Sequence, residues 1–167
     1  MFCFGLFLFL AHSLTFLFSS HCGVLQQGDL VTLADVAPEN RKEVLSVVTL
    51  WNVNGFKVSS FESPERVNCI AISSVMDGVN VNLLVGGLES GAVMIWTAWD
   101  LAPIRKVFDS SVPILSVAIS SDNSFFLTGN QKGEVVSWGK KLTEKDKRKF
   151  SSVGINPPIN IISCQAK

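Results

Sequence analysis

The sequence has no tyrosine, and one end of it carries no charge. None of residues 1–27 is Lys, Arg, Asp or Glu, whereas the 167 residues together have 14 basic and 14 acidic side chains. The formal net charge is therefore zero, which excludes the positive field that directs a protein to nucleic acid. We expect no nucleic-acid partner for this chain.

Signals for metal binding and catalysis are also missing. No Cys-x-x-Cys pair occurs among the four cysteines, which are Cys3, Cys22, Cys69 and Cys164, so the common zinc patterns are absent. Both histidines, His12 and His21, lie in the uncharged end, away from the acidic residues that a Ser–His–acid triad needs. Gly86–Ala92 (GGLESGA) has the glycines of a phosphate loop, but Ala92 stands where its lysine must be. We expect no enzyme, metal, cofactor or small-molecule substrate.

The uncharged end is rich in phenylalanine. Phe2–Phe18 reads FCFGLFLFLAHSLTFLF, which is at the lower limit for a membrane-spanning helix and is also typical of the apolar core of a signal peptide. No Lys or Arg precedes the run, and the chain has no Asn-x-Ser/Thr sequon, both of which argue against secretion. We predict an apolar helix over residues 1–27, outside the domain, as a signal, an anchor or a gene-model artefact such as a mispredicted first exon.

The residues after this uncharged end contain an internal repeat. Cys69–Ser74 (CIAISS) returns as Ser116–Ser121 (SVAISS), and each copy is followed by an apolar run, a glycine turn, a second apolar run and Trp. Four matches share an offset of 42 residues: Gly87 with Gly129, Gly91 with Gly133, Val93 with Val135, and Trp96 with Trp138. Trp51 lies 45 residues before Trp96. A period of about 40–45 residues with a closing Trp is typical of a WD40-type propeller blade.

Short apolar runs between Gly, Pro, Asn and Asp predict the strands of these blades. They are 29–34, 46–51 and 56–61 in the first unit, 67–72, 82–86, 92–96 and 104–108 in the second, and 114–119, 125–128 and 135–138 in the third. Asp35–Val44 interrupts the first unit as a polar, exposed loop insertion. The predicted fold is all-β, a partial WD40-type propeller of about three blades over residues 28–140, followed by a basic, flexible tail over 141–167.

The repeated tryptophans and glycines are expected to be structural. Trp51, Trp96 and Trp138 close the third strand of each blade, where we expect the ring to pack between neighbouring sheets. The paired glycines, which are Gly87, Gly91, Gly129 and Gly133, belong to the same repeated framework. Trp99, next to Asp100, either anchors the connection to the fourth strand or lies on a face of the propeller.

Two stretches of the second unit resemble a known family. They are Gly78–Gly91 (GVNVNLLVGGLESG) and Ile95–Arg105 (IWTAWDLAPIR), and Leu50–Gly55 (LWNVNG) and Gly28–Thr32 (GDLVT) add to them. These stretches are similar to the C-terminal WD40 propeller of the BEACH-domain proteins, a family that includes lysosomal trafficking regulators, WD-repeat and FYVE-domain proteins, and neurobeachins. The resemblance covers residues 28–140. A FYVE zinc domain has no counterpart in the tail, because only Cys164 remains there.

The resemblance implies a non-catalytic protein-interaction module of a large scaffold in vesicle traffic, lysosome function or autophagy. Such a scaffold is cytoplasmic and peripheral to endosomal and lysosomal membranes, and its blade loops or faces bind other proteins. The expected partner contacts are exposed residues of the longer loops, namely Glu39, Arg41, Lys42 and Asp77. The alternative is that these loops only solvate the sheet edges. The basic run Lys140–Lys149 is a solvated surface, a contact for anionic lipid or an acidic partner, or a nuclear import signal.

Two other readings stay open. The chain is alternatively a secreted or membrane-tethered β-domain, if the apolar head is genuine, or an incomplete fragment without independent function. Three blades leave sheet edges and faces uncovered, and typical propellers have 4–8 blades. We therefore predict that residues 28–140 alone do not form a stable monomer.

Overall fold

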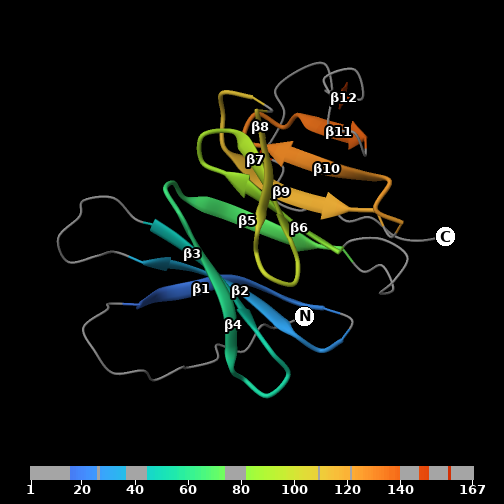
Figure 1. Ribbon diagram of the computed structural model, residues 1–167. Helices are drawn as coiled ribbons and strands as arrows, with labels where there is room; N and C mark the ends of the chain where they lie inside the picture. The colour runs from blue at the N-terminus through green and yellow to red at the C-terminus, as the bar shows by residue number, and fades with distance from the viewer. Residues whose placement is uncertain are drawn as a thin grey trace.

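The regular structure of the described residues consists of β-strands alone. The computed structural model describes residues 16–25, 27–36, 45–73, 82–108, 110–120, 122–139, 147–150 and 158. These residues form three four-stranded antiparallel sheets (Figure 1). The prediction of an all-β fold with three repeated units is therefore confirmed.

Each sheet is a meander in which consecutive strands pair. Sheet 1 contains β1 (Phe16–Val24), β2 (Leu30–Val36), β3 (Leu45–Trp51) and β4 (Lys57–Ser63). Sheet 2 contains β5 (Val67–Ile72), β6 (Leu83–Leu88), β7 (Ala92–Thr97) and β8 (Pro103–Phe108). Sheet 3 contains β9 (Ile114–Ile119), β10 (Phe125–Asn130), β11 (Val135–Gly139) and β12 (Lys147–Phe150).

The predicted N-terminal helix is wrong for residues 16–24. This segment is strand β1, which pairs antiparallel with β2 so that Cys22 lies opposite Thr32. A continuous apolar run has no periodicity that separates a helix from a buried strand, and here the open edge of β2 provides the pairing partner. Residues 1–15 lie outside the described residues. No helix in the described part of the chain could span a membrane.

The predicted flexible tail also contributes a strand. β12 pairs with β11, with Arg148 opposite Ser137, although its sequence KRKF has no strand-like alternation. Positively charged side chains are common on edge strands because they discourage pairing with other chains. The rest of the tail beyond residue 140 lies outside the described residues, apart from Pro158.

Two apolar cores lie between the three sheets and hold them together. The first lies between sheets 1 and 2 and contains Leu33 and Val48 from sheet 1 with Leu84 and Trp96 from sheet 2. The second lies between sheets 2 and 3 and contains Val85, whose side chain points away from that of Leu84. β6 and β7 are therefore buried on both faces, which explains their continuous apolar sequences.

The first strands of the three sheets, β1, β5 and β9, lie next to one another, while β4, β8 and β12 form outer edges. The sheets fan out from the first strands (Figure 1). Two glycines, Gly23 in β1 and Gly87 in β6, allow neighbouring sheets to approach closely. A Cβ on Gly23 would lie 2.6 Å from Ile72 Cδ1, and one on Gly87 would lie 2.5 Å from Ile114 Cγ2. The arrangement is consistent with neighbouring blades of a propeller.

Candidate protein-interaction surface

The repeated tryptophans occupy equivalent places with different burial. Trp96 is fully buried in the first core and meets the ring of Phe61 edge-on, with centroids 5.4 Å apart. Trp138 is buried in the second core and stacks on Phe126 at 5.9 Å. Trp51 is only half-buried. Sheet 2 packs on the opposite face of sheet 1, so among the described sheets none covers the Trp51 face.

A hydrogen bond holds two of these rings in place. Trp51 Nε1 donates to Thr32 Oγ1 at 2.9 Å, and Trp138 Nε1 donates to Thr128 Oγ1 at 3.3 Å. Gly86 stands in the corresponding position of sheet 2, and Trp96 Nε1 has no partner among the described residues. A Cβ on Gly86 would lie 2.8 Å from Trp96 Cζ3. In sheet 2 the ring therefore fills the space that the threonine side chain takes in the other sheets.

A buried polar cluster ties sheet 1 to the start of β5. The Ser46 hydroxyl donates to Asp35 Oδ1 at 2.6 Å, and Arg66 Nε donates to Asp35 Oδ2 at 3.1 Å. Ser46 Oγ in turn accepts the Val67 N–H at 2.9 Å. Asp35 is buried at the end of β2, so the prediction that it begins an exposed loop is wrong. Its charge is compensated by Ser46 and Arg66, which lie too far along the chain for a local pattern to reveal.

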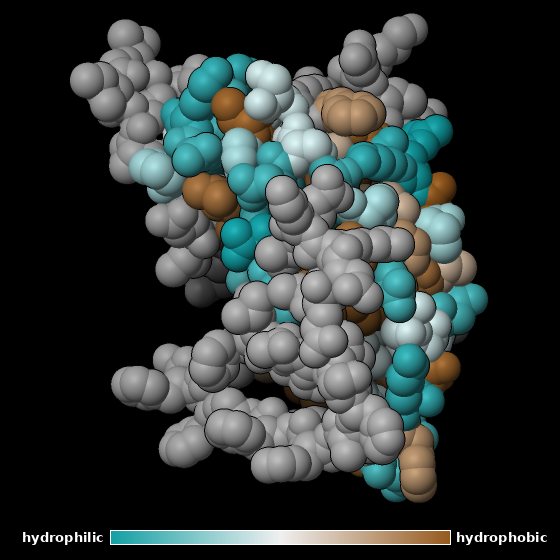
Figure 2. Space-filling model, turned by 90° about the vertical axis from the view of Figure 1, so that its left-hand side faces the viewer, coloured by the Kyte–Doolittle hydropathy of each residue, from teal (hydrophilic) through white to brown (hydrophobic). Residues whose placement is uncertain are grey.

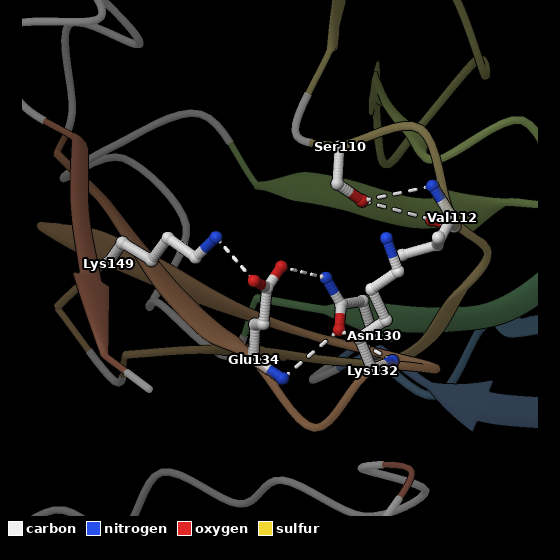
Figure 3. A network of polar contacts seen from close by, with 6 residues as sticks. All are labelled: Ser110, Val112, Asn130, Lys132, Glu134 and Lys149. Carbon is white, nitrogen blue, oxygen red and sulfur yellow. Dashed lines mark hydrogen bonds and ion pairs between the residues drawn. The ribbon is translucent and has the colours of Figure 1, made fainter. Parts of the chain in front are cut away.

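A second polar network secures β12 (Figure 3). Asn130 Oδ1 accepts the N–H groups of Lys132 and Glu134, each at 3.0 Å, while Asn130 Nδ2 donates to Glu134 Oε2 at 2.8 Å. Lys149 on β12 forms an ion pair with Glu134. Nearby, Ser110 Oγ accepts the Val112 N–H and donates to its carbonyl oxygen. One lysine of the basic run is thus engaged within sheet 3, and Arg148 is exposed.

A lysine at the equivalent position of sheet 2 also forms an ion pair, but with a glutamate from a different part of the chain. Lys106 on β8 is equivalent to Lys149 on β12, because their partners Met94 and Val136 hold matching places in β7 and β11. Lys106 pairs with Glu65 in the β4–β5 connection. These are partly exposed pairs, so each contributes at most about 1 kcal/mol. Their effect is to orient the outer strands.

The structure describes the predicted structural glycines, but it does not describe the predicted partner contacts. Gly87 and Gly129 are buried within strands, while Gly91 and Gly133 end turns with φ of 82° and 75°. The four predicted partner contacts lie outside the described residues; they are Glu39, Arg41, Lys42 and Asp77. Those contacts remain predictions.

Trp99 and Asp100 lie in the β7–β8 turn. The Trp99 side chain is 44% exposed, so it is available at the surface. Asp100 accepts the Thr97 hydroxyl and the Ala102 N–H, and these hydrogen bonds, that of Thr97 first, lower the pKa of its carboxyl group. Two further exposed apolar side chains, Val53 at 71% and Phe56 at 70%, flank the Asn54-Gly55 turn. Large apolar residues beside such a turn are a signal that the sequence analysis did not use.

Comparison with known proteins shows which proteins this sequence is similar to. Over 123 residues, or 72% of this chain, the sequence is 35% identical to the human lysosomal-trafficking regulator. Over 76 residues, or 46% of this chain, it is 28% identical to the lysosomal-trafficking regulator of Drosophila melanogaster. The chain is homologous to a segment of the lysosomal-trafficking regulators. It spans only 3% of the human protein and 2% of the fly protein, and no family model matches it.

Two further observations concern the surface of the described residues. No group of three His, Cys, Asp or Glu side chains is placed to hold a metal ion in the described ranges. Figure 2 shows the molecule from the left-hand side of Figure 1, with apolar residues singly or in small groups among hydrophilic ones in the coloured part. The coloured residues form no continuous apolar area in this view.

Cys69 is a buried thiol whose reactivity we predict to be low. Burial raises the pKa of Cys69 to about 12, and the thiolate is the reactive form. Iodoacetamide at about pH 8 is therefore expected to leave Cys69 unmodified in the folded chain and to modify the exposed Cys22. Peptide mass spectrometry before and after urea unfolding measures both sites. Equal labelling of Cys22 and Cys69 in the folded chain would contradict the burial of β5.

Acid is expected to weaken the β9–β10 turn. Asp122 Oδ1 accepts the hydroxyls of Ser120 and Ser124 and the Ser124 N–H, which lowers the pKa of Asp122 from 3.8 to about 2. Because the folded pKa is the lower one, the stabilisation is complete above pH 3.8 and is lost as the pH falls through about 2. Urea titrations across this range should show a steeper loss for the natural chain than for Asp122→Asn. Parallel curves would rule out a contribution from this carboxylate.

Proposed function

We propose that the chain is a non-catalytic protein-interaction module of a BEACH-type scaffold that acts in vesicle and lysosome trafficking or autophagy. The observation that carries the proposal is the 35% identity to the human lysosomal-trafficking regulator over 123 residues. The three four-stranded sheets of the described residues, which resemble propeller blades, support it further. Its place would be the cytoplasm, peripheral to endosomal and lysosomal membranes. The binding elements would be its loops and sheet faces, without a cofactor.

The face of sheet 1 that no described sheet covers supports a role inside a larger propeller. Trp96 and Trp138 are each covered by the sheet that precedes their own, whereas Trp51 is half-buried on a face that no described sheet covers. Closed propellers need at least about four blades. We propose that a further blade-like sheet packs against Trp51 in the complete assembly. The same observation fits an incomplete fragment, so an experiment must separate the two.

The secretory alternative has a structural cost at β1. If residues 1–27 were cleaved off as a signal, the strand that pairs with β2 would be removed. Sheet 1 would then lose its first strand and its contact with β5. A mature secreted form would need another segment at this edge.

The first test is the mass and location of the endogenous protein. An antibody against residues 122–139, run on soluble, membrane and secreted fractions, should detect a band much larger than 18.2 kDa that is peripheral to lysosomal membranes. Depletion of that protein should change lysosome size. A band near 18.2 kDa in the secreted fraction, with unchanged lysosomes, would contradict the proposal and favour the secretory reading.

A further inference from the structure

Seven large apolar side chains are exposed at one end of the three sheets. We call them the turn surface; they are Val24, Val53, Phe56, Val58, Trp99, Ile104 and Phe125. They lie in, or within two residues of, the β1–β2, β3–β4, β7–β8 and β9–β10 connections. The other exposed large apolar residues in the described ranges, Phe108 and Phe150, lie at the far ends of β8 and β12.

The connections of the turn surface share one end because the sheets have the same orientation. In an antiparallel meander the first and third connections lie at one end and the second at the other. Gly23 at the end of β1 lies against Ile72 at the end of β5. Asn68 near the start of β5 donates to the Ile114 carbonyl oxygen at the start of β9, at 3.1 Å. The first strands therefore run in the same direction.

Hydrogen bonds hold the turns of sheets 1 and 2 together. The Ser59 hydroxyl on β4 donates to the Asp100 carbonyl oxygen in the β7–β8 turn at 2.7 Å. The Val53 N–H donates to Asp29 Oδ1 at 3.2 Å, which joins the β3–β4 turn to the β1–β2 turn. Phe56 and Trp99 are thus carried by turns that are fixed relative to each other. Pre-ordered side chains lose little entropy on binding.

The chemistry of the turn surface is unusual for connections. Turn residues are generally polar, and a gathering of exposed apolar side chains marks an interaction site. Trp is enriched among residues that dominate binding energy. In the four connections named above and the strand starts beside them, the charges of the described residues are mainly acidic: Asp29, Asp100 and Asp122, against Lys57 at the start of β4. The acidic carboxylates complement a basic partner and disfavour an anionic membrane.

We propose that the turn surface docks an extended protein segment that carries Arg or Lys beside aromatic or branched apolar side chains. Trp99 and Phe56 contact the apolar side chains, and the carboxylates of Asp100 and Asp122 face the basic ones. This inference rests on the proposed protein-interaction function and deepens it by naming the face and the chemistry of the partner.

The test uses the full chain and two short fluorescent peptides. One peptide alternates Arg with Leu and Phe, and the other has Glu in place of each Arg. Fluorescence anisotropy should show binding of the Arg peptide alone, with a change in Trp emission that is lost in Trp99→Ala. Trp99→Ala and Phe56→Ser should each weaken binding about tenfold or more. Phe108→Ser is the matched control, because Phe56 and Phe108 are both 70% exposed, and it should bind normally.

Several results would overturn the docking proposal. The charge complementarity would be wrong if the Glu peptide bound as well as the Arg peptide, and the docking site would be wrong if neither peptide bound or if Phe108→Ser weakened binding as much as Phe56→Ser. Binding to phosphatidylserine vesicles without peptide binding would indicate a membrane contact instead. Self-association that Trp99→Ala abolishes would indicate a second copy of the chain as the partner. The short-wavelength emission of buried Trp96 and Trp138 shows whether each variant is folded. If Trp99→Ala does not fold, Phe56→Ser provides the test of the turn surface. Because peptide binding is measured apart from lysosome size, either proposal can fail while the other holds.

Discussion

Replacing Trp96 with alanine is expected to lower the free energy of unfolding by about 3–5 kcal/mol. The indole is fully buried between sheets 1 and 2 and contacts Phe61 of the outer strand β4. Its removal leaves a cavity that two packed sheets cannot close. Since a domain of this size has a total stability of about 5–15 kcal/mol, the variant should be largely unfolded at moderate urea. Urea titration of the full chain by circular dichroism measures the loss.

Trp99→Ala is the matched control for this prediction. The same side chain is removed, but Trp99 is 44% exposed in a turn, so we expect a loss below about 1 kcal/mol. Circular dichroism is the appropriate signal because both variants remove a tryptophan fluorophore. Similar losses for Trp96→Ala and Trp99→Ala would mean that sheets 1 and 2 do not pack around Trp96.

The internal repeat was sufficient to predict most strands because it reflects repeated hydrogen bonds. Ser73 and Ser120 are equivalent residues, next to last in the two copies of the duplicated segment. The Ser73 hydroxyl accepts the Leu83 N–H at 2.8 Å, and the Ser120 hydroxyl accepts the Phe125 N–H at 3.1 Å. Each serine thus joins the first strand of its sheet to the second, and the pattern on either side keeps its register.

Features outside the repeat could not be predicted in this way. β1 has an apolar sequence without helical or strand periodicity, and β12 has a charged one, so pairing with β2 and β11 decides both. Asp35 is buried because Ser46 and Arg66 meet it, and Arg66 is distant in sequence. Trp51 matches Trp96 in the pattern but not in burial. The difference comes from the neighbouring sheet, which no local signal encodes.

The candidate surface depended even more on the three-dimensional arrangement. The sequence left Trp99 between two roles, and its exposure in the β7–β8 turn is compatible with a place on a face. Val53 and Phe56 belong to the other sheet, and Ser59 brings their turn to that of Trp99. Residues from separate repeats became one surface only through the packing of sheets 1 and 2.

Gly91 is a backbone position where we expect the second large effect. Its φ is 82°, a conformation that L side chains rarely adopt. A Cβ there would lie 2.2 Å from the Ser110 carbonyl oxygen and 2.6 Å from that of Val112. Both neighbours are backbone atoms, so a rotamer change cannot relieve the overlap. The β6–β7 turn and the connection from β8 to β9 would have to separate.

Gly91→Ala is therefore expected to cost about 1–2 kcal/mol for the left-handed backbone and a further 1–3 kcal/mol or so for the overlap. Gly55→Ala is the matched control, because Gly55 also has a positive φ, of 80°, but no atom lies within 4 Å of its added Cβ. It should show the backbone cost alone. Urea midpoints of the two variants measure the difference. If Gly91→Ala and Gly55→Ala lost the same stability, the close contact between this turn and Ser110 would be absent in solution, and the path of the chain from sheet 2 to sheet 3 would differ from the one described.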